Sequence, residues 1–278
     1  MIPRVRGRSR IEMPILGQGT WRMGENPSRR RQEVEALQIG LDLGMTLIDT
    51  AEMYADGGAE EVVGDAIHGR RHDVFVVSKV LPHNASREGT VQAAERSLER
   101  LRTEWIDLYL LHWPGRHPLE STFEAFEQLE RQGKVRYFGV SNFDLHEMET
   151  AEALPAGERV AANQVLYNLD RRSIERRILP WCLRREILIM AYSPLEQGRL
   201  GAKRALEDVA ERHGATPSQI ALVWTLRHDN VVAIPKASLP EHVRENAASL
   251  AISLTDQDLA DLDRAYPAPT RDVPLDML

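Results

Sequence analysis

Short apolar runs alternate with longer amphipathic segments along the whole chain. The short runs are rich in valine, isoleucine and leucine, which is typical of parallel strands buried on both faces. They predict eight strands, at residues 13–16, 46–49, 74–78, 106–111, 135–140, 160–164, 187–192 and 231–234. The alternation therefore predicts an α/β protein.

Between the predicted strands, apolar residues recur three or four positions apart, as they do along the buried face of a helix. The clearest groups are Val34, Leu37 and Leu41; Val91, Ala94, Leu98 and Leu101; and Ile174, Ile178, Trp181 and Cys182. Gly44, Gly133 and Gly214 follow helical segments, where a left-handed residue commonly ends a helix. The run Thr216-Pro217-Ser218-Gln219 has the pattern of a capping box that starts one.

The repeated order of strand and then helix implies a parallel sheet. A doubly wound open sheet is the main competitor, but the count of eight units and the polar residues at the strand ends favour a closed barrel. We therefore predict a single (β/α)8 TIM barrel that takes up residues 1–278 as one domain, since such barrels use about 250 residues. The proline-rich stretch 267–278 is expected to lie over the barrel as a tail.

Composition and charge narrow the possible partners. The formal net charge is −7, whereas a nucleic-acid-binding domain usually carries a basic face, so we expect no nucleic-acid partner. No apolar run approaches the roughly 20 residues of a membrane span, and no apolar segment follows the basic N-terminus as it would in a secretory signal. The single cysteine, Cys182, fits a reducing compartment and is expected to be a small buried apolar group. We expect a cytoplasmic protein, and a monomer because no helix pattern has a spare apolar stripe.

Candidate chemistry gathers where three consecutive strands end. Asp49 ends the second strand and Tyr54 follows in its loop, Lys79 ends the third strand, and His112 ends the fourth. Taken singly, each has an ordinary alternative: a helix cap, a loop aromatic, a surface lysine or a structural histidine. Chemistry in such barrels lies at the C-terminal ends of the strands, so the four together predict one active site.

These four groups suit the protonation of a carbonyl oxygen. A phenol holds its proton at neutral pH, and a nearby ammonium is expected to lower the pKa of Tyr54. A carboxylate would hold Lys79 in place, and a neutral imidazole could orient the substrate oxygen. The set contains no reducing group, so a hydride donor must come from a cofactor.

The motifs around the strand ends resemble the aldo-keto reductase superfamily, and small bacterial members such as the methylglyoxal reductases in particular. The resemblance covers nearly the whole chain and rests on the order and spacing of Gly17-Gln18-Gly19-Thr20-Trp21, Asp49-Thr50-Ala51-Glu52-Met53-Tyr54, Leu110-Leu111-His112-Trp113, Gly139-Val140-Ser141-Asn142-Phe143, Asn163-Gln164, Ala191-Tyr192-Ser193-Pro194-Leu195 and Ile234-Pro235-Lys236. It implies an oxidoreductase that reduces small aldehydes and ketones, 2-oxoaldehydes such as methylglyoxal among them, with NADPH.

The resemblance implies a role for each member of the tetrad. Tyr54 is the proton donor, Lys79 lowers its pKa, Asp49 pairs with Lys79, and His112 orients the carbonyl group. Gly17 and Gly19 are expected to form a tight turn that brings Thr20 and Trp21 to the pocket.

The resemblance also places the cofactor. Ser141, Asn142 and Gln164 are expected to bind the nicotinamide carboxamide, Tyr192 to stack on the ring, and Ser193 and Leu195 to follow the pyrophosphate. Lys236 is expected to meet the 2′-phosphate. The remaining cofactor contacts are expected from Thr20, Trp21, Asp49, Ile234, Ser238, His242, Glu245 and Asn246.

One position departs from the family pattern. Many members carry an arginine six residues after the phosphate-binding lysine, and this chain has His242 there. An imidazole carries a full charge only when it is protonated. NADPH is still favoured because of Lys236, and NADH is less firmly excluded than is usual in the family.

The substrate pocket is expected to be an apolar frame around a polar centre. Its predicted residues are Trp21, Met53, Tyr54, His112 and Trp113. The segment after Leu195 and the C-terminal tail are both short, which predicts an open site that accepts small reactive carbonyl compounds.

Two other functions stay open from the sequence. A cofactor-binding regulatory module would keep the fold but turn over slowly. A barrel hydrolase or isomerase could use His112 with Glu52 and Asp49, although it would leave Tyr54 and Lys79 without roles. We expect no metal site, because the sequence shows no cluster with metal-ligand spacing.

Overall fold

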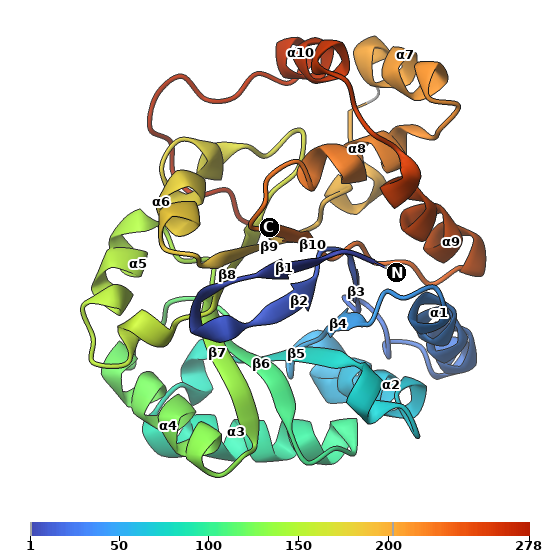
Figure 1. Ribbon diagram of the computed structural model, residues 1–278. Coiled ribbons are helices and arrows are strands. Elements are labelled where there is room, and N and C mark those ends of the chain that lie inside the picture. Colours follow the sequence, from blue (N-terminus) through green and yellow to red (C-terminus); the bar gives the residue numbers. More distant parts are fainter. Residues whose placement is uncertain (1, 202) are drawn as a thin grey trace.

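A computed structural model describes residues 2–201 and 203–278. In this part of the chain, a parallel sheet of eight strands surrounds a central axis (Figure 1). Its strands, in order, are β3 (Gly17–Gly19), β4 (Leu47–Asp49), β5 (Phe75–Val80), β6 (Ile106–Leu111), β7 (Val135–Ser141), β8 (Ala162–Leu166), β9 (Leu188–Tyr192) and β10 (Val231–Ala233). Parallel bridges from Leu16 to Ala233 and from Gly19 to Lys236 join the first and last strands. The predicted (β/α)8 barrel is confirmed, and an open doubly wound sheet is excluded.

Helices cover the outside of the barrel (Figure 1). They are α1 (Arg30–Asp42), α2 (Gly58–Ala66), α3 (Arg87–Leu101), α4 (Leu119–Arg131), α5 (Leu145–Glu152), α6 (Ile178–Arg184), α7 (Arg204–Arg212), α8 (Pro217–Thr225), α9 (Pro240–Ala248) and α10 (Asp256–Ala265). The predicted N-terminal cap of one helix and the predicted glycines after three helices are confirmed. Thr216 and Gln219 form a capping box before α8, and Gly44, Gly133 and Gly214 have positive φ angles.

The prediction for the first strand was wrong. Residues 12–14 belong to a hairpin of β1 (Arg4–Arg6) and β2 (Glu12–Pro14), and the first barrel strand is β3. The apolar residues Val5, Ile11 and Met13 of this hairpin segment pack against the barrel interior, so the hairpin closes the N-terminal end of the barrel.

Close packing explains why β3 carries glycine instead of an apolar pattern. A Cβ atom at Gly17 would lie 2.6 Å from Leu47 Cγ, and one at Gly19 would lie 2.8 Å from the Ile234 carbonyl oxygen. Both glycines lie inside the strand β3, so the tight turn predicted for them is wrong. Thr20 and Trp21 still follow directly at the barrel mouth.

The helix predicted around Ile174 and Cys182 is interrupted. A short 3-10 turn covers Ser173–Glu175, and α6 begins only at Ile178. Pro180 explains the break, because its ring cannot donate a hydrogen bond and would clash with the carbonyl of Arg176 inside a continuous helix. Cys182 is buried as predicted, and burial raises its pKa to about 12.

The barrel interior positions the site. Side chains alternate between the two faces of a strand, and the inward-facing apolar layers include Leu47, Phe75, Val77, Leu108, Leu110, Ala162, Leu188 and Met190. Two positions after the last of these on each strand come Asp49, Lys79, His112, Gln164 and Tyr192. The polar residues predicted for chemistry therefore form the last inward layer, at the C-terminal mouth of the barrel.

The C-terminal stretch 267–278 has no helix or strand and lies as a tail over the α6 side of the barrel (Figure 1). Asp272 pairs with Arg176 at 2.6 Å, and Asp276 exchanges backbone and side-chain hydrogen bonds with Ser173. The tail ends beside Tyr192. Burial raises the pKa of Tyr192 to about 12, and the nearby Leu278 amide opposes that rise.

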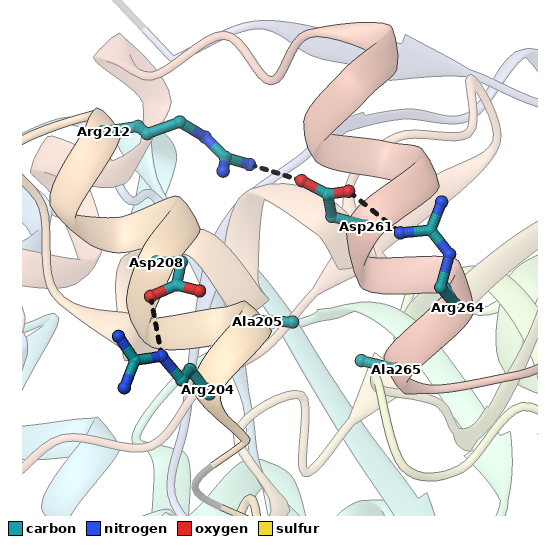
Figure 2. Close-up of a pocket in the computed structure, with 7 residues that line it drawn as sticks. All are labelled: Arg204, Ala205, Asp208, Arg212, Asp261, Arg264 and Ala265. Atoms are coloured by element: carbon teal, nitrogen blue, oxygen red, sulfur yellow. Dashed lines mark hydrogen bonds and ion pairs between the residues drawn. The ribbon is translucent and has the colours of Figure 1, made fainter.

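Two surface hollows lie away from the C-terminal mouth of the barrel. One, of about 370 Å³, lies between α7 and α10. The ion pair Arg212–Asp261 joins the two helices there, and Arg204–Asp208 is a pair within α7 (Figure 2). The other, of about 450 Å³, lies beside the β1–β2 hairpin and is lined by Arg4, Arg10, Glu12, Phe75, Asp107, Arg136 and Tyr137. Neither contains a residue predicted for catalysis or cofactor binding.

Candidate active site

Lys79 connects three of the four predicted catalytic residues. Its Nζ donates to Asp49 Oδ2 at 2.9 Å, to the Thr50 carbonyl oxygen at 2.7 Å and to the Tyr54 hydroxyl at 3.3 Å. The Lys79 side chain is completely buried, which excludes an ordinary surface lysine. The structure therefore brings Asp49, Lys79 and Tyr54 together.

A short turn at Tyr54–Gly57 aims the Tyr54 ring into the barrel mouth. Ala55 and Asp56 have φ angles of 52° and 51°, and Gly57 has a φ angle of 91°, so the chain bends sharply directly after Tyr54. The Tyr54 ring lies edge-on to Trp21 at 5.0 Å and to His112 at 5.9 Å between ring centroids. Trp21 and His112 thus hold the Tyr54 ring on two sides, and the Tyr54 hydroxyl points toward Lys79.

Burial governs the protonation of this group of residues. Burial and then the charge of Asp49 raise the pKa of Tyr54 well above its usual value. The sequence predicted the opposite direction, from Lys79. Burial is the main cause of the difference, because it disfavours the charged phenolate, and the negative charge of Asp49, which pairs with Lys79 at 2.9 Å, adds to it. Burial also lowers the pKa of Lys79, although Asp49 opposes this, and it raises the pKa of Asp49. Tyr54 therefore holds its proton firmly at neutral pH.

His112 is a neutral imidazole at the same mouth. Burial and then the charge of Lys79 lower its pKa to about 2. Its Nδ1 atom is buried and has no hydrogen-bond partner among the residues that the structure describes. A neutral ring beside the Tyr54 hydroxyl can hydrogen-bond a substrate oxygen without adding charge to the site.

Because His112 is neutral, kcat for carbonyl reduction should show no inflection near pH 6.5 that depends on this residue. The measurement is the pH profile of kcat between about pH 5 and 8 for the wild type and for His112→Gln. We expect a lower rate for the variant and the same profile shape. An acidic limb in the wild type that disappears in His112→Gln would show that the imidazole titrates.

Asn142 joins the next strands to the tetrad. Its backbone is left-handed, with a φ angle of 57°, and its Nδ2 donates to the His112 carbonyl oxygen at 3.1 Å. Its Oδ1 accepts from the Tyr192 hydroxyl at 3.0 Å. The Gln164 amide donates to Asp49 Oδ1 at 2.7 Å, and the Ser141 hydroxyl donates to the Gln164 carbonyl oxygen at 2.9 Å. The residues predicted to bind the nicotinamide thus share one hydrogen-bond network with Asp49.

The loop after β9 carries Ser193 and Leu195 and is held from one side. Ser193 and Glu196 both have φ angles of 46°. Asn168 Nδ2 donates to the Ser193 carbonyl oxygen and to Glu196 Oε2, each at 2.8 Å. Arg171 pairs with Glu196 at 3.1 Å. Asn168, Arg171 and Glu196 were not predicted from the sequence, because nothing in their spacing predicts a contact between two different loops.

Lys236 follows β10, which pairs with β9, and it forms a bridge to Gly19 at the end of β3. Its Nζ donates to Ser238 Oγ at 2.6 Å. Burial lowers its pKa, Glu33 opposes this, and Arg22 and Arg29 add to the lowering, so these two arginines lie close enough for their charges to act on Lys236. Neither arginine was predicted from the sequence, since both come from the segment between β3 and α1.

The other predicted cofactor contacts of this edge lie on the segment from Ile234 to Ser238 and on α9. Gln32 at the start of α1 donates to the Ser238 carbonyl oxygen at 3.0 Å, which fixes α1 against this segment. Ile234 is buried at the end of the barrel interior. His242, Glu245 and Asn246 all lie on α9, where Asn246 is buried and the other two are exposed.

The predicted substrate frame is aromatic. Trp113 contacts His112, with ring centroids 4.7 Å apart. Trp21 is 40% exposed, which leaves one side of the mouth open. Met53 is half-buried and packs against the core. Thr20 is buried, and its hydroxyl donates to the Asp49 carbonyl oxygen at 2.9 Å, so it holds β3 to β4.

Comparison with known proteins agrees with this arrangement. The model of the Aldo/keto reductase family matches residues 15–267. The chain belongs to this family. It is 50% identical over 273 residues to methylglyoxal reductase YeaE of Escherichia coli, covering 96% of each chain. It is 36% identical over 257 residues to a glyoxal reductase of Bacillus subtilis, covering 91% of this chain and 89% of that one.

The fold agrees with solved members of the aldo/keto reductase family. A crystal structure of an aldo/keto reductase from Klebsiella pneumoniae in complex with NADP and acetate has a TM-score of 0.97 and 49% identity, covering 100% of both chains. The chain is therefore an oxidoreductase of this family, and the predicted resemblance is confirmed. In the described residues, no helix has the length and apolar character needed to cross a membrane. The same residues contain no group of three histidine, cysteine or acidic side chains suited to a metal ion.

Proposed function

We propose that this protein reduces small aldehydes and ketones with NADPH, 2-oxoaldehydes such as methylglyoxal among them, with Tyr54 as the proton donor. The observation that carries the proposal is the buried contact of Lys79 with both Asp49 and Tyr54 beside a neutral His112. The names of the relatives in Escherichia coli and Bacillus subtilis support the carbonyl class.

The residues at the barrel mouth fit NADPH. Ser141, Asn142 and Gln164 present a hydroxyl and two amides beside the tetrad, and these groups match a carboxamide. After β10, Lys236 forms no ion pair within residues 2–201 and 203–278 and bonds only Ser238, which suits a phosphate. The relative from Klebsiella pneumoniae was crystallised with NADP. When bound, NADPH would supply the hydride.

The protein's own residues handle the proton. As negative charge develops on the carbonyl oxygen, the Tyr54 hydroxyl gives up its proton to that oxygen. Lys79, 3.3 Å away, stabilises the phenolate that remains. His112 orients the oxygen through a hydrogen bond and stays uncharged. Asp49 keeps the ammonium in place with Gln164 as its second partner.

The shape of the mouth supports small substrates. Trp21, Tyr54, His112 and Trp113 form a rigid aromatic frame, and the partly exposed Trp21 gives access from solvent. A panel of carbonyl compounds with graded size, from glyoxal and methylglyoxal to bulky ketones, tests this part of the proposal. We expect kcat/KM to fall as bulk increases. Equal values across the panel would contradict a size limit set by this frame.

No observation favours the two alternatives over reduction. A hydrolase would need Glu52 as a base near His112, but Glu52 Oε1 accepts from the Leu81 amide at 2.7 Å and from Asn84 at 3.0 Å. Glu52 therefore holds the segment after β5. A regulatory module would not need the buried contacts of Lys79 with Asp49 and Tyr54, which the structure contains. A monomeric state, a cytoplasmic location and the lack of a nucleic-acid partner remain predictions.

Lys236→Met should weaken NADPH binding much more than NADH binding. Removing one phosphate contact of this kind is expected to raise the Kd for NADPH by about 10-fold to 100-fold, since charge-assisted hydrogen bonds contribute roughly 1.5–3 kcal/mol. The Kd for NADH, which lacks the 2′-phosphate, should change less than about twofold. Fluorescence titration with both cofactors checks this result.

The arginines near Lys236 provide the matched comparison. Arg29→Gln should raise the Kd for NADPH by a smaller factor than Lys236→Met and should also leave NADH unaffected. Equal weakening of both cofactors by Lys236→Met would remove the 2′-phosphate assignment.

A further inference from the structure

A second buried carboxylate lies behind the tetrad, outside the barrel. Glu60 on α2 is completely buried. Its Oε1 accepts from the Ser78 hydroxyl at 2.5 Å, and its Oε2 accepts from Arg100 Nε at 2.6 Å. A buried charge costs several kcal/mol unless it is paired and hydrogen-bonded. Ser78 and Arg100 offset this cost, and they fix the Glu60 carboxylate in the layer between the strands and the helices.

Glu60 holds β5 at the residue before Lys79. Side chains alternate along the strand, so Ser78 points outward to Glu60 while Lys79 points inward to Asp49 and Tyr54. A hydrogen bond at Ser78 thus fixes the position of the backbone that carries Lys79.

Arg100 links the same carboxylate to the turn that carries Tyr54. A Cβ atom at Gly57 would lie 2.5 Å from Arg100 Cδ and Nε, so the Arg100 side chain packs directly against the last residue of the turn Tyr54–Gly57. This guanidinium also holds Glu60. One ion pair therefore contacts both chain segments whose relative position sets the distance from Lys79 to Tyr54.

The charge of Glu60 reaches Lys79. Inside the barrel, Lys79 faces Asp49 from β4, Tyr54 from the turn and His112 after β6. Glu60 on α2 lies behind β5, on the other side of the strand. Burial lowers the pKa of Lys79, and Asp49 and then Glu60 oppose that lowering.

The other groups around Glu60 are one cation and two neutral side chains. Arg100 from α3 pairs with Glu60 at 2.6 Å and contacts Ser97 at 3.3 Å, and Tyr109 comes from β6. Burial raises the pKa of Tyr109 well above its usual value, and Glu52 and Glu60 add to that rise, so Tyr109 stays neutral.

We propose that Glu60 is a positioning residue for the reduction. With Arg100 it holds β5 and the turn of Tyr54 in the arrangement that the contact between Lys79 and Tyr54 needs. The inference rests on the proposed function and deepens it.

The test is the pH profile of kcat for methylglyoxal reduction by Glu60→Gln, with Glu61→Gln as the matched control. Loss of the Glu60 charge lets Lys79 lose its proton at lower pH. We expect the alkaline midpoint of kcat to fall by about one pH unit, the size of a charge interaction screened by protein. Above the midpoint, kcat should then be about tenfold below that of the wild type, with the KM for NADPH unchanged.

Glu61 is the neighbouring acidic residue on α2, and it pairs with Arg30 near the surface. Glu61→Gln should leave the profile as it is in the wild type. The double variant Glu60→Gln/Arg100→Gln leaves neither buried charge unpaired, which protects the fold, and it should shift the midpoint in the same direction.

Each other outcome overturns the inference. A profile identical to the wild type would show that Glu60 does not act on the site. A uniform loss of kcat at every pH, with an unchanged midpoint in both the single and the double variant, would show a structural role only. No turnover by the wild type would overturn the proposed function itself, and this inference with it.

Discussion

Tyr54→Phe is expected to lower kcat for NADPH-dependent carbonyl reduction by about 10² to 10⁴-fold, the usual contribution of a positioned general acid. The variant loses only the hydroxyl that Lys79 contacts at 3.3 Å. The phenyl ring keeps its edge contacts with Trp21 and His112, so the fold should be unchanged. Steady-state kinetics of NADPH oxidation with methylglyoxal provide the measurement.

Binding and stability separate this chemical effect from a structural one. The Kd for NADPH and the Tm of Tyr54→Phe should both stay close to the wild-type values. Activity within a few-fold of the wild type would refute Tyr54 as the proton donor. A large loss of NADPH binding would show instead that Tyr54 serves the cofactor site.

Lys79→Met should damage both activity and stability. The variant removes the cation that stabilises the Tyr54 phenolate, so we expect kcat to fall by about 10²-fold or more. It also leaves Asp49 as a completely buried carboxylate whose remaining side-chain partner is Gln164. Breaking a buried ion pair in this way typically costs about 3–5 kcal/mol, which thermal or denaturant unfolding would detect.

The double variant Asp49→Asn/Lys79→Met separates the two effects. It removes the unpaired charge, and the oxygen of the new side-chain amide can still accept the Gln164 hydrogen bond. We expect most of the lost stability to return while kcat stays low. If the double variant recovered activity together with stability, the loss in Lys79→Met would be a folding defect and Lys79 would have no part in the chemistry.

The barrel was predictable because its strands are buried on both faces. Seven of the eight predicted strands overlap strands of the barrel, since runs such as 106–111 leave few alternatives to a buried parallel strand. The first strand was missed because β3 is Gly17-Gln18-Gly19, where the neighbouring Leu47 side chain and Ile234 carbonyl leave no room for apolar side chains. Its signal is close packing, which a hydrophobic pattern does not show.

The positions of the candidate site residues were also predictable, because parallel strands deliver their C-terminal ends to one mouth. The contact of Lys79 with Asp49 and Tyr54 follows from this rule together with the family resemblance. The electrostatic balance was not predictable. The raised pKa of Tyr54 depends on how deeply the phenol is buried and on how close the charge of Asp49 lies, and both need coordinates.

Residues that join different helices and strands could not be predicted from the sequence, because their contacts also depend on the coordinates. Glu60, Ser78 and Arg100 come from α2, β5 and α3, and each would pass for a solvent-facing or structural residue in its own segment. The same holds for Arg22 and Arg29 near Lys236. Sequence spacing describes neighbours within one element, whereas these contacts depend on how the helices pack on the barrel.

The most direct test of the central claim is the initial rate of NADPH oxidation by the purified wild-type protein with methylglyoxal. We expect loss of nicotinamide absorbance only when protein and carbonyl compound are both present, with a higher kcat/KM for NADPH than for NADH. No oxidation with methylglyoxal or any other carbonyl compound, despite NADPH binding shown by fluorescence quenching, would contradict it and would favour a regulatory module.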